Sequence, residues 1–230
     1  MIDIHCHILP GIDDGPSSIE ASVEMAKIAA TDGIETIVAT PHVQEKTPSV
    51  SAIESALAAL NERLKSEGIP IRVLRGADVP SHLNPADLRH RTINSTRYIL
   101  IEFPHSHLPA SARETLFNLS VHGYRPIITH PERNSSVIRR PETLLNLLSS
   151  DVKVQITADS LTGHFGADIA ACARFLLKKG VVDFLATDAH SATYRQPVLS
   201  DAVRIAGKIL GKAKAAQLVT TNPAAVIAGR

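Results

Sequence analysis

Short runs of aliphatic residues recur along the chain and alternate with longer amphipathic segments. The short runs are apolar at almost every position, whereas a strand with one wet face is apolar at every second position. Continuous apolar runs are typical of strands that are covered on both faces. They predict seven strands, at residues 2–5, 35–40, 71–77, 98–102, 126–129, 153–157 and 182–186.

The amphipathic segments between these runs predict helices. In residues 19–30 the apolar positions are spaced by four, three and four, which forms one stripe along a helix. Ser17 or Ser18 can cap its start, and Gly33 suits its end. The same reasoning predicts helices at residues 51–65, 110–121, 141–148, 167–179, 198–210, 212–218 and 223–228.

The regular alternation of strand and helix predicts an α/β fold. No linker or low-complexity segment interrupts the 230 residues, so we expect residues 1–230 to form a single domain. Seven strand–helix units favour a closed or nearly closed parallel (β/α)7 barrel resembling a TIM barrel. A doubly wound open sheet is the alternative.

Composition narrows the class of protein. Aromatic residues make up only 3% and Trp is absent, so the core must be aliphatic, and a net charge of +1 argues against a nucleic-acid surface. No apolar run approaches the ~18 residues of a membrane helix. Cys6 and Cys172 lie far apart in sequence, so we expect no disulfide. Polar residues interrupt the first positions of the chain, so we expect no export signal. A cytoplasmic protein follows.

The eleven histidines are numerous for this length, and five of them fall at the ends of predicted strands. Carboxylates fall there too, so six of the seven strands carry a candidate metal ligand at the same end. In a parallel barrel those ends share one face, which is where active sites form. The candidates are His5, His7, His42, Asp78, Glu102, His130, Asp188 and His190, with Asp13 and Asp14 in the loop after the first strand.

The remaining histidines are more typical of surface or loop positions. They are His82, His90, His105, His107, His122 and His164. Two of them, His105 and His107, follow the strand that ends at Glu102 and could line the site. His82 lies close enough to Asp78 in sequence to be considered as well.

Several buried carboxylates close together are unstable without cations. A salt-bridge network is the alternative to metal, but Arg133 and Arg195 are the main basic residues near these strand ends. Imidazole and carboxylate ligands without thiolate suit Mn, Fe, Zn or Ni. Eight or nine ligands are too many for one ion, so we expect two or three divalent ions, with Asp78 and Glu102 as bridging carboxylates. Clustered ions of this kind serve hydrolysis.

Arg133 and Arg195 each follow a candidate ligand by a few residues. A guanidinium can hold a phosphate through two parallel hydrogen bonds. Pairing with a nearby surface acid is the alternative. We expect both arginines to bind the phosphoryl group of a substrate.

These motifs resemble the PHP (polymerase and histidinol phosphatase) superfamily, and most closely its CpsB/CapC-type manganese-dependent protein-tyrosine phosphatases. The similarity runs along nearly the whole chain, in order. It covers residues 1–7, 13–16, 36–42, 97–103, 126–133 and 186–190, Arg195 with Pro197, and Asn222 with Pro223.

The resemblance implies a distorted seven-stranded PHP barrel with a trinuclear site. The implied ligands are His5, His7, Asp14, His42, Glu102, His130, Asp188 and His190, and Arg133 with Arg195 would hold the phosphate. The implied substrate is the phosphotyrosine tail of a bacterial tyrosine kinase that controls capsule or exopolysaccharide assembly. Asp78 departs from the family, which usually has Glu there, so metal binding at that position could differ.

Three other functions share parts of this pattern. A small-molecule PHP phosphatase, acting for example on histidinol phosphate, would have the same metal cluster. A PHP exonuclease module is disfavoured by the near-neutral charge and few aromatic residues. A non-enzymatic scaffold is disfavoured by the retained ligands. The sequence leaves the oligomeric state open.

Overall fold

The computed structural model describes residues 1–43 and 47–230 and shows a mixed α/β fold in which all strand pairs are parallel. The strands form two sheets, ordered β1-β2-β3 and β4-β5-β6-β7-β8. A single open sheet, the alternative from the sequence, is therefore not observed. The strands are β1 (Ile2–Cys6), β2 (Thr36–Ala39), β3 (Arg72–Arg75), β4 (Asp78–Pro80), β5 (Tyr98–Glu102), β6 (Arg125–Thr129), β7 (Lys153–Thr157) and β8 (Phe184–Ala186).

The described residues thus form eight strands, where the sequence predicted seven. The strand predicted at residues 71–77 is β3, which ends at Arg75, and the additional strand is β4, which begins at Asp78 after a short break. Gly76 passes so close to β2 that an added Cβ would lie 2.6 Å from Val38 Cγ1. Beyond this glycine the chain leaves β2 and pairs with β5, so Asp78 opens a strand instead of following one.

The two sheets meet at two junctions, each made by an isolated parallel bridge. Cys6 pairs with Ala189 at one junction, and His42 pairs with Asp78 at the other. Backbone hydrogen bonds from Asp188 N to His5 O, at 2.7 Å, and from Val43 N to Asp78 O, at 3.1 Å, reinforce them. Both junctions therefore carry residues that the sequence singled out as candidate ligands.

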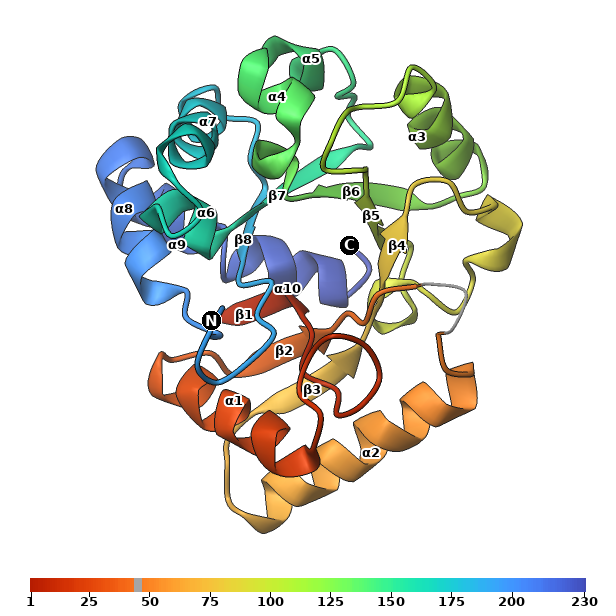
Figure 1. The fold of residues 1–230 in the computed structure, drawn as a ribbon, viewed down its shortest axis with the longest axis vertical. Helices are drawn as coiled ribbons and strands as arrows, with labels where there is room; N and C mark the ends of the chain where they lie inside the picture. The colour runs from red at the N-terminus through yellow and green to blue at the C-terminus, as the bar shows by residue number, and fades with distance from the viewer. Residues whose placement is uncertain (44–46) are drawn as a thin grey trace.

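The helices lie outside the strands in Figure 1, except α10. The α-helices are α1 (Ile19–Thr31), α2 (Val50–Ser66), α3 (Ala112–Val121), α4 (Ser135–Arg139), α5 (Glu142–Leu145), α6 (Ala158–Thr162), α7 (Ala167–Lys178), α8 (Ser200–Leu210), α9 (Lys212–Gln217) and α10 (Thr221–Ile227). Three short 3₁₀ helices are η1 (Pro85–Asp87), η2 (Ile93–Ser95) and η3 (Pro131–Arg133).

Each predicted helix has a counterpart among the described residues, and the differences concern helices of four or five residues. The Ser18 hydroxyl accepts a hydrogen bond from Ala21 N and caps α1 as expected. The segment predicted at 141–148 shrinks to α5, and α4 and α6 were not predicted. Helices of about one turn contain too few residues to show a 3.6-residue period. Within the described residues, no helix combines the length and apolarity needed to cross a membrane.

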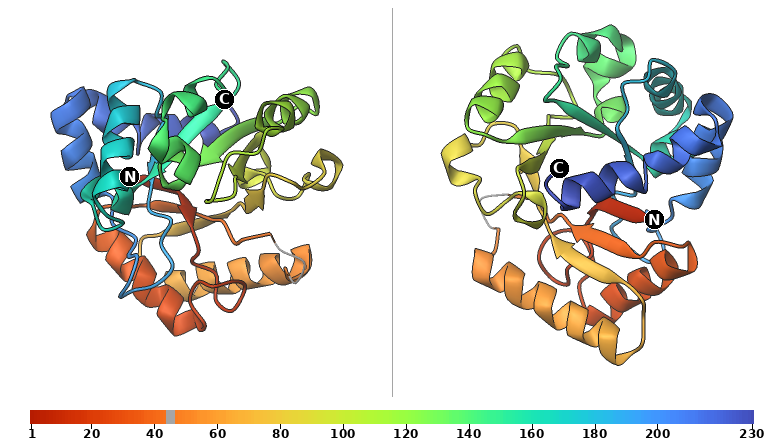
Figure 2. Two further views of the ribbon diagram at one scale, coloured as in Figure 1. Left: turned by 45° about the horizontal axis from the view of Figure 1, so that its top comes forward. Right: turned by 180° about the vertical axis from the view of Figure 1, so that it is seen from behind.

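A small inner core is enclosed by strands of both sheets. Ile4 of β1, Leu74 of β3 and Leu100 of β5 all belong to it, and Val226 of α10 closes it. The right-hand view in Figure 2, which shows the molecule from behind, has α10 crossing in front of the strands. Tyr98, at the start of β5, donates a hydrogen bond to Arg230 O at 2.6 Å. The C-terminal segment therefore covers the amino ends of the strands and leaves their carboxyl ends open.

Candidate metal centre

Strand alternation places the carboxylates of Glu102 and Asp188 in the space above the inner core. Tyr98 and Leu100 face that core, so Glu102, two residues further along β5, points the same way. Phe184 and Ala186 of β8 face it as well, and Asp188 follows with the same phase. Glu102 and Asp188 thus reach the carboxyl end of the strands because their apolar neighbours are buried beneath them.

His5 and His7 need a different explanation. Ile4 already faces the inner core, so regular alternation would turn His5 away from it. The pairing register between β1 and β2 shifts between Asp3 and Cys6, which changes the phase. His5 Nε2 and His7 Nε2 consequently lie only 3.3 Å apart.

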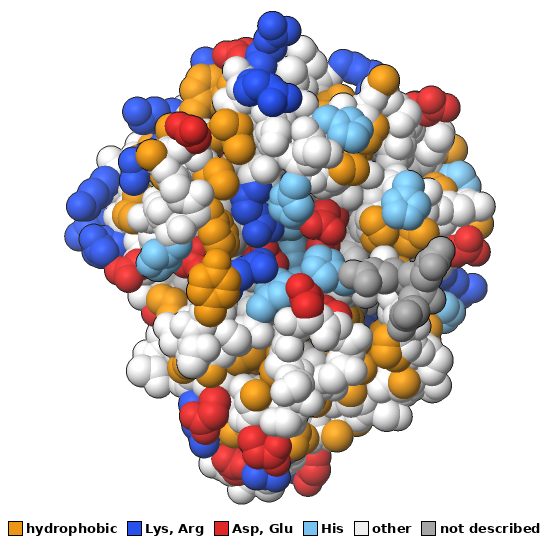
Figure 3. Space-filling model, viewed as in Figure 1, with side chains coloured by type: hydrophobic (Ala, Val, Ile, Leu, Met, Phe, Trp, Pro, Cys, Tyr) orange, Lys and Arg blue, Asp and Glu red, His pale blue; other side chains and the backbone are white. Residues whose placement is uncertain are grey.

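All nine residues proposed as metal ligands converge at this end of the strands. They form overlapping groups in which the nearest ligand atoms all lie within 4.8 Å of one another. The groups are His7-Asp14-His42-His190, His5-His130-Asp188, His5-His7-Asp78, His42-Asp78-Glu102 and Glu102-His105-His130. Figure 3 shows histidines and carboxylates gathered at the middle of this face.

Three of the histidines are oriented by an acceptor at Nδ1. His5 Nδ1 lies 2.9 Å from Gln155 Oε1, His7 Nδ1 lies 2.6 Å from Asp13 Oδ2, and His190 Nδ1 lies 2.9 Å from Asp188 O. Each ring therefore presents its Nε2 to the centre of the cluster. Metal-binding histidines in proteins are held in this way, because the acceptor fixes the tautomer and the ring plane.

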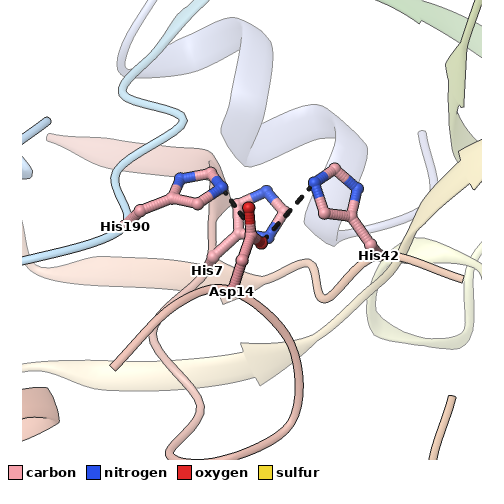
Figure 4. Close-up of side chains that lie close together, drawn as sticks. All are labelled: His7, Asp14, His42 and His190. Atoms are coloured by element: carbon pink, nitrogen blue, oxygen red, sulfur yellow. Dashed lines mark ion pairs between the residues drawn. The ribbon is translucent and has the colours of Figure 1, made fainter. Parts of the chain in front are cut away.

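Figure 4 shows His7, Asp14, His42 and His190 directed toward one another from three separate loops. Asp14 Oδ1 lies 3.4 Å from His190 Nε2 and 3.8 Å from His42 Nε2. Asp14 is largely exposed and lies at the opening of the site, whereas His7 is buried beneath it.

The protonation states suit metal binding. Burial lowers the pKa of His5 and of His130, so both imidazoles are neutral and can act as ligands. Burial alone would raise the pKa of Asp188, but the positive charge of Arg133 outweighs it and holds that pKa well below its usual value. The site therefore offers the neutral imidazoles of His5 and His130 beside the ionised carboxylate of Asp188.

His7 shows that positive charge is favoured here. Burial acts to lower its pKa, but the carboxylates of Asp13 and Asp188 outweigh this effect and raise the pKa to about 10. Asp188 Oδ1 lies 3.3 Å from His7 Nε2. A divalent ion held by His7 and Asp188 would supply positive charge here in place of the proton on His7.

Asp78 provides the clearest test of whether the residues suit a metal. Its side chain is fully buried, and its Oδ2 has no hydrogen-bond partner among the described residues. His42 Nδ1 lies 3.3 Å and His5 Nε2 lies 3.8 Å from that oxygen. A buried carboxylate oxygen without a donor is costly, and a bound cation removes the cost. Although Asp78 is shorter than the Glu that the family usually has, its carboxylate still lies near both His5 and His42.

Three residues of the site adopt left-handed backbone conformations that side chains other than glycine rarely take. The φ angles are 34° for His130, 52° for Asp188 and 56° for Arg195. Strain of this kind concentrates at functional sites, where the fold holds side chains in fixed positions.

Arg133 and Arg195 lie beside the cluster, as expected. Both guanidinium groups pair with Asp188 Oδ2. The Nε atoms of both arginines are buried without a hydrogen-bond partner in the described part of the chain. Each arginine is thus held next to the candidate ligands with donor capacity left for an anion.

Sequence reasoning left several contributors outside the predicted site. His105, grouped with the surface or loop histidines but noted as able to line the site, stacks on His130 at 5.2 Å between ring centroids, and its Nε2 lies 3.4 Å from Glu102 Oε1. Gln155 is a polar residue in a buried strand, and that mismatch could have revealed it. Asp13 was noted but given no role, and the sequence offers no signal that separates it from Asp14.

Comparison with known proteins places these features in a family. Residues 1–228 match the family model described as capsular polysaccharide synthesis, CpsB/CapC. The tyrosine-protein phosphatase YwqE of Bacillus subtilis is 40% identical over 219 residues, covering 92% of this chain and 85% of that protein. The putative tyrosine-protein phosphatase CapC of Staphylococcus aureus is 36% identical, covering 85% and 79%.

A solved structure agrees with this similarity. It comes from work on YwqE of Bacillus subtilis and CpsB of Streptococcus pneumoniae, described as unique metal-dependent tyrosine phosphatases. The TM-score is 0.94 at 37% sequence identity, and the match covers 100% of this chain and 95% of that one.

Proposed function

Because the chain belongs to the CpsB/CapC family, we propose that it is a metal-dependent protein-tyrosine phosphatase that acts in capsular polysaccharide synthesis. The observation that carries this proposal is the set of histidines whose Nε2 atoms face shared carboxylates, with two arginines beside them. Such a site combines metal binding with phosphate binding, a combination that serves phosphate-ester hydrolysis.

The chain is α/β with parallel sheets, and we take its two sheets as one distorted barrel of the PHP type that forms a single domain over residues 1–230. The two bridged junctions and the inner core shared by both sheets support this reading.

The metals would be held by the converging side chains. The proposed ligands are His5, His7, Asp14, His42, Asp78, Glu102, His130, Asp188 and His190. This number suits two or three divalent ions, and imidazole with carboxylate suits manganese, with iron or zinc as alternatives. When bound, such ions activate water and neutralise charge on the phosphoryl oxygens.

The chain's own residues account for the other requirements. Arg133 and Arg195 bind the phosphoryl group and stabilise the charge that develops on it. Phosphate binding would compete with Asp188 for both guanidinium groups, which remain adjacent to the ligands. The departing phenolate needs little protonation, since the pKa of tyrosine is about 10. No nucleophilic cysteine is required, and burial raises the pKa of both Cys6 and Cys172, which keeps them as inert thiols.

The proposed partner is the phosphotyrosine tail of a bacterial tyrosine kinase in the cytoplasm. The family description, capsular polysaccharide synthesis, supports a substrate of that pathway. A disordered tail can reach a site that opens at the surface, as this one does beside the exposed Asp14.

A substrate panel tests the function. Purified protein with added Mn²⁺ is assayed on phosphotyrosine peptides, histidinol phosphate and single-stranded DNA, with and without chelator. We expect the phosphotyrosine peptides to be the best substrates, the chelator to stop turnover and Mn²⁺ to restore it. Faster turnover of histidinol phosphate would identify a small-molecule phosphatase instead. Full activity in the chelated protein would remove the metal from the proposal.

A further inference from the structure

A cavity of about 370 Å³ lies beside Arg195 and includes none of the proposed metal ligands. Two aromatic side chains, Phe165 and Tyr194, contribute to its lining. Its volume is at the lower end of the range for small-ligand sites, roughly 300–1,000 Å³. Neither the metal centre nor the core accounts for this cavity.

Phe165 connects the cavity to the phosphate-binding residues. Its ring centroid lies 5.4 Å from Arg133 Cζ and 5.9 Å from Arg195 Cζ. One aromatic ring therefore lies against both guanidinium groups, at distances typical of cation–π contacts. Figure 3 shows hydrophobic side chains next to basic ones at the edge of the histidine cluster.

The loop that carries Phe165 is short and held in place. Asp159 O accepts hydrogen bonds from Gly163 N at 3.2 Å and from His164 N at 3.0 Å. Gly163 and Gly166 flank the aromatic residue with φ angles of 97° and 98°, which only glycine adopts without strain. The ring is thus positioned before any ligand binds.

Tyr194 lies on a second tight turn that leads into Arg195. Its backbone N donates to Ser191 Oγ at 2.8 Å, and His190 N donates to Arg195 O at 3.0 Å. The tyrosine side chain is 73% exposed, so core packing does not explain its position. An exposed aromatic residue beside a cavity is available for contact with a ligand.

The charges of the lining suit a neutral group. Asp159 Oδ1 lies 2.8 Å from His164 Nδ1, and Asp201 Oδ1 lies 2.7 Å from Arg204 Nη2. Both acids of the lining are therefore already paired with basic groups. Arg195, the basic side chain of the lining, is directed to Asp188. An uncharged ring is better matched to this cavity than a second phosphate.

We infer that this cavity is the subsite for the aromatic ring of an aryl phosphate ester, with Phe165 as its wall. The inference rests on the proposed function, which puts the phosphoryl group at Arg133 and Arg195. In an aryl phosphate one oxygen separates the ring from phosphorus, so the ring lies close to the two arginines and hence close to Phe165. Alkyl phosphates have no ring to pack there, so the subsite selects phosphotyrosine over phosphoserine.

Binding of unreactive phosphonates to the Mn²⁺-loaded protein tests the subsite by calorimetry. Benzylphosphonate carries a ring and a CH₂ group in place of the ester oxygen, and ethylphosphonate lacks the ring. We expect Phe165→Ala to weaken benzylphosphonate binding about three- to tenfold, as loss of an aromatic pair does, and to leave ethylphosphonate binding unchanged. Phe117→Ala is the matched control, because Phe117 is 65% exposed on α3 and does not line this cavity.

Equal weakening of both phosphonates would overturn the inference, because Phe165 would then only position the arginines. Unchanged binding of benzylphosphonate would overturn it as well. Phe165→Leu keeps an apolar side chain without a ring and controls for a folding defect. It should weaken benzylphosphonate binding selectively, but less than Phe165→Ala does. Since phosphonates are not hydrolysed, these results do not depend on turnover. Failure to hydrolyse phosphotyrosine peptides would instead count against the proposed function.

Discussion

The proposed metal centre has a buried half and an open rim, and the two differ in how their charges are satisfied. The buried half, His5, His7, Asp78, His130 and Asp188, has almost no access to solvent. The rim, Asp14, His42, Glu102 and His105, is partly exposed, with 65% of the Asp14 side chain and 54% of the His105 side chain in contact with solvent. Water can solvate the rim, whereas the buried half depends on protein partners or bound cations.

This difference has a consequence for mutation. Removing one charge from the buried half leaves its partners unpaired in a medium of low polarity, which is costly. Removing one from the rim exposes its partners to water, which compensates for much of the loss. We therefore expect the effect of a substitution to follow burial, even among residues with the same proposed role.

The largest effect is expected for Asp188→Asn. Asp188 contacts His5, His7 and both arginines, so the substitution removes the shared partner of imidazoles and guanidinium groups. Turnover of a phosphotyrosine peptide should fall at least about a thousandfold. Steady-state assays with excess Mn²⁺ measure the turnover. Glu20→Gln is the control, because Glu20 is an exposed acid on α1. Near-normal turnover of the Asn variant would contradict the idea that burial determines the effect.

Arg133→Ala should come next, because Arg133, which is only slightly exposed, pairs with the buried Asp188 and is proposed to bind phosphate. We expect kcat/KM to fall about a hundred- to a thousandfold, which is typical when a donor to the transition state is lost. Arg133→Lys should retain only part of the wild-type kcat/KM, since an ammonium group cannot form two parallel hydrogen bonds to a phosphate. Unaltered inhibition by inorganic phosphate in the Ala variant would remove Arg133 from phosphate binding.

Asp13→Asn tests the groups that orient the ligands. Asp13 Oδ2 lies 2.6 Å from His7 Nδ1 and also accepts a hydrogen bond from His42 N at 3.0 Å. Losing such an orienting carboxylate commonly weakens metal binding about 10- to 100-fold. Titration of the metal-free protein with Mn²⁺ measures the affinity, and turnover at saturating Mn²⁺ should change much less. An unchanged Mn²⁺ affinity would show that His7 does not need Asp13.

The smallest effect is expected at the rim, for His105→Ala. His105 stacks on His130 and contacts Glu102, but half of its side chain faces water. We expect turnover and Mn²⁺ affinity to change less than about threefold, in line with the small contribution of exposed ion pairs. A loss comparable to that of Asp188→Asn would place His105 among the essential ligands and break the contrast between rim and buried half.

The sequence alone determined the class of fold and most of the proposed site. Continuous apolar runs identified buried parallel strands, since such strands need no polar face. The ends of those runs located Glu102, His130 and Asp188. Strand alternation past the last buried residue sets the direction of Glu102 and Asp188, whereas His130 lies three residues beyond the core-facing Ile127 and does not follow that alternation. Apolar runs and the residues at their ends are local features, so they can be recognised from a single sequence.

Tertiary structure decided what depends on contacts between distant segments. The break that makes Asp78 the start of β4 arises where Gly76 passes against Val38 of β2. The roles of Asp13 and His105 depend on rings from other loops that meet them only in the folded chain. Phe165, in the loop between α6 and α7, meets the two arginines only in the folded chain as well. Local periodicity carries no information about such encounters, because packing between elements, and not spacing along the chain, sets these distances.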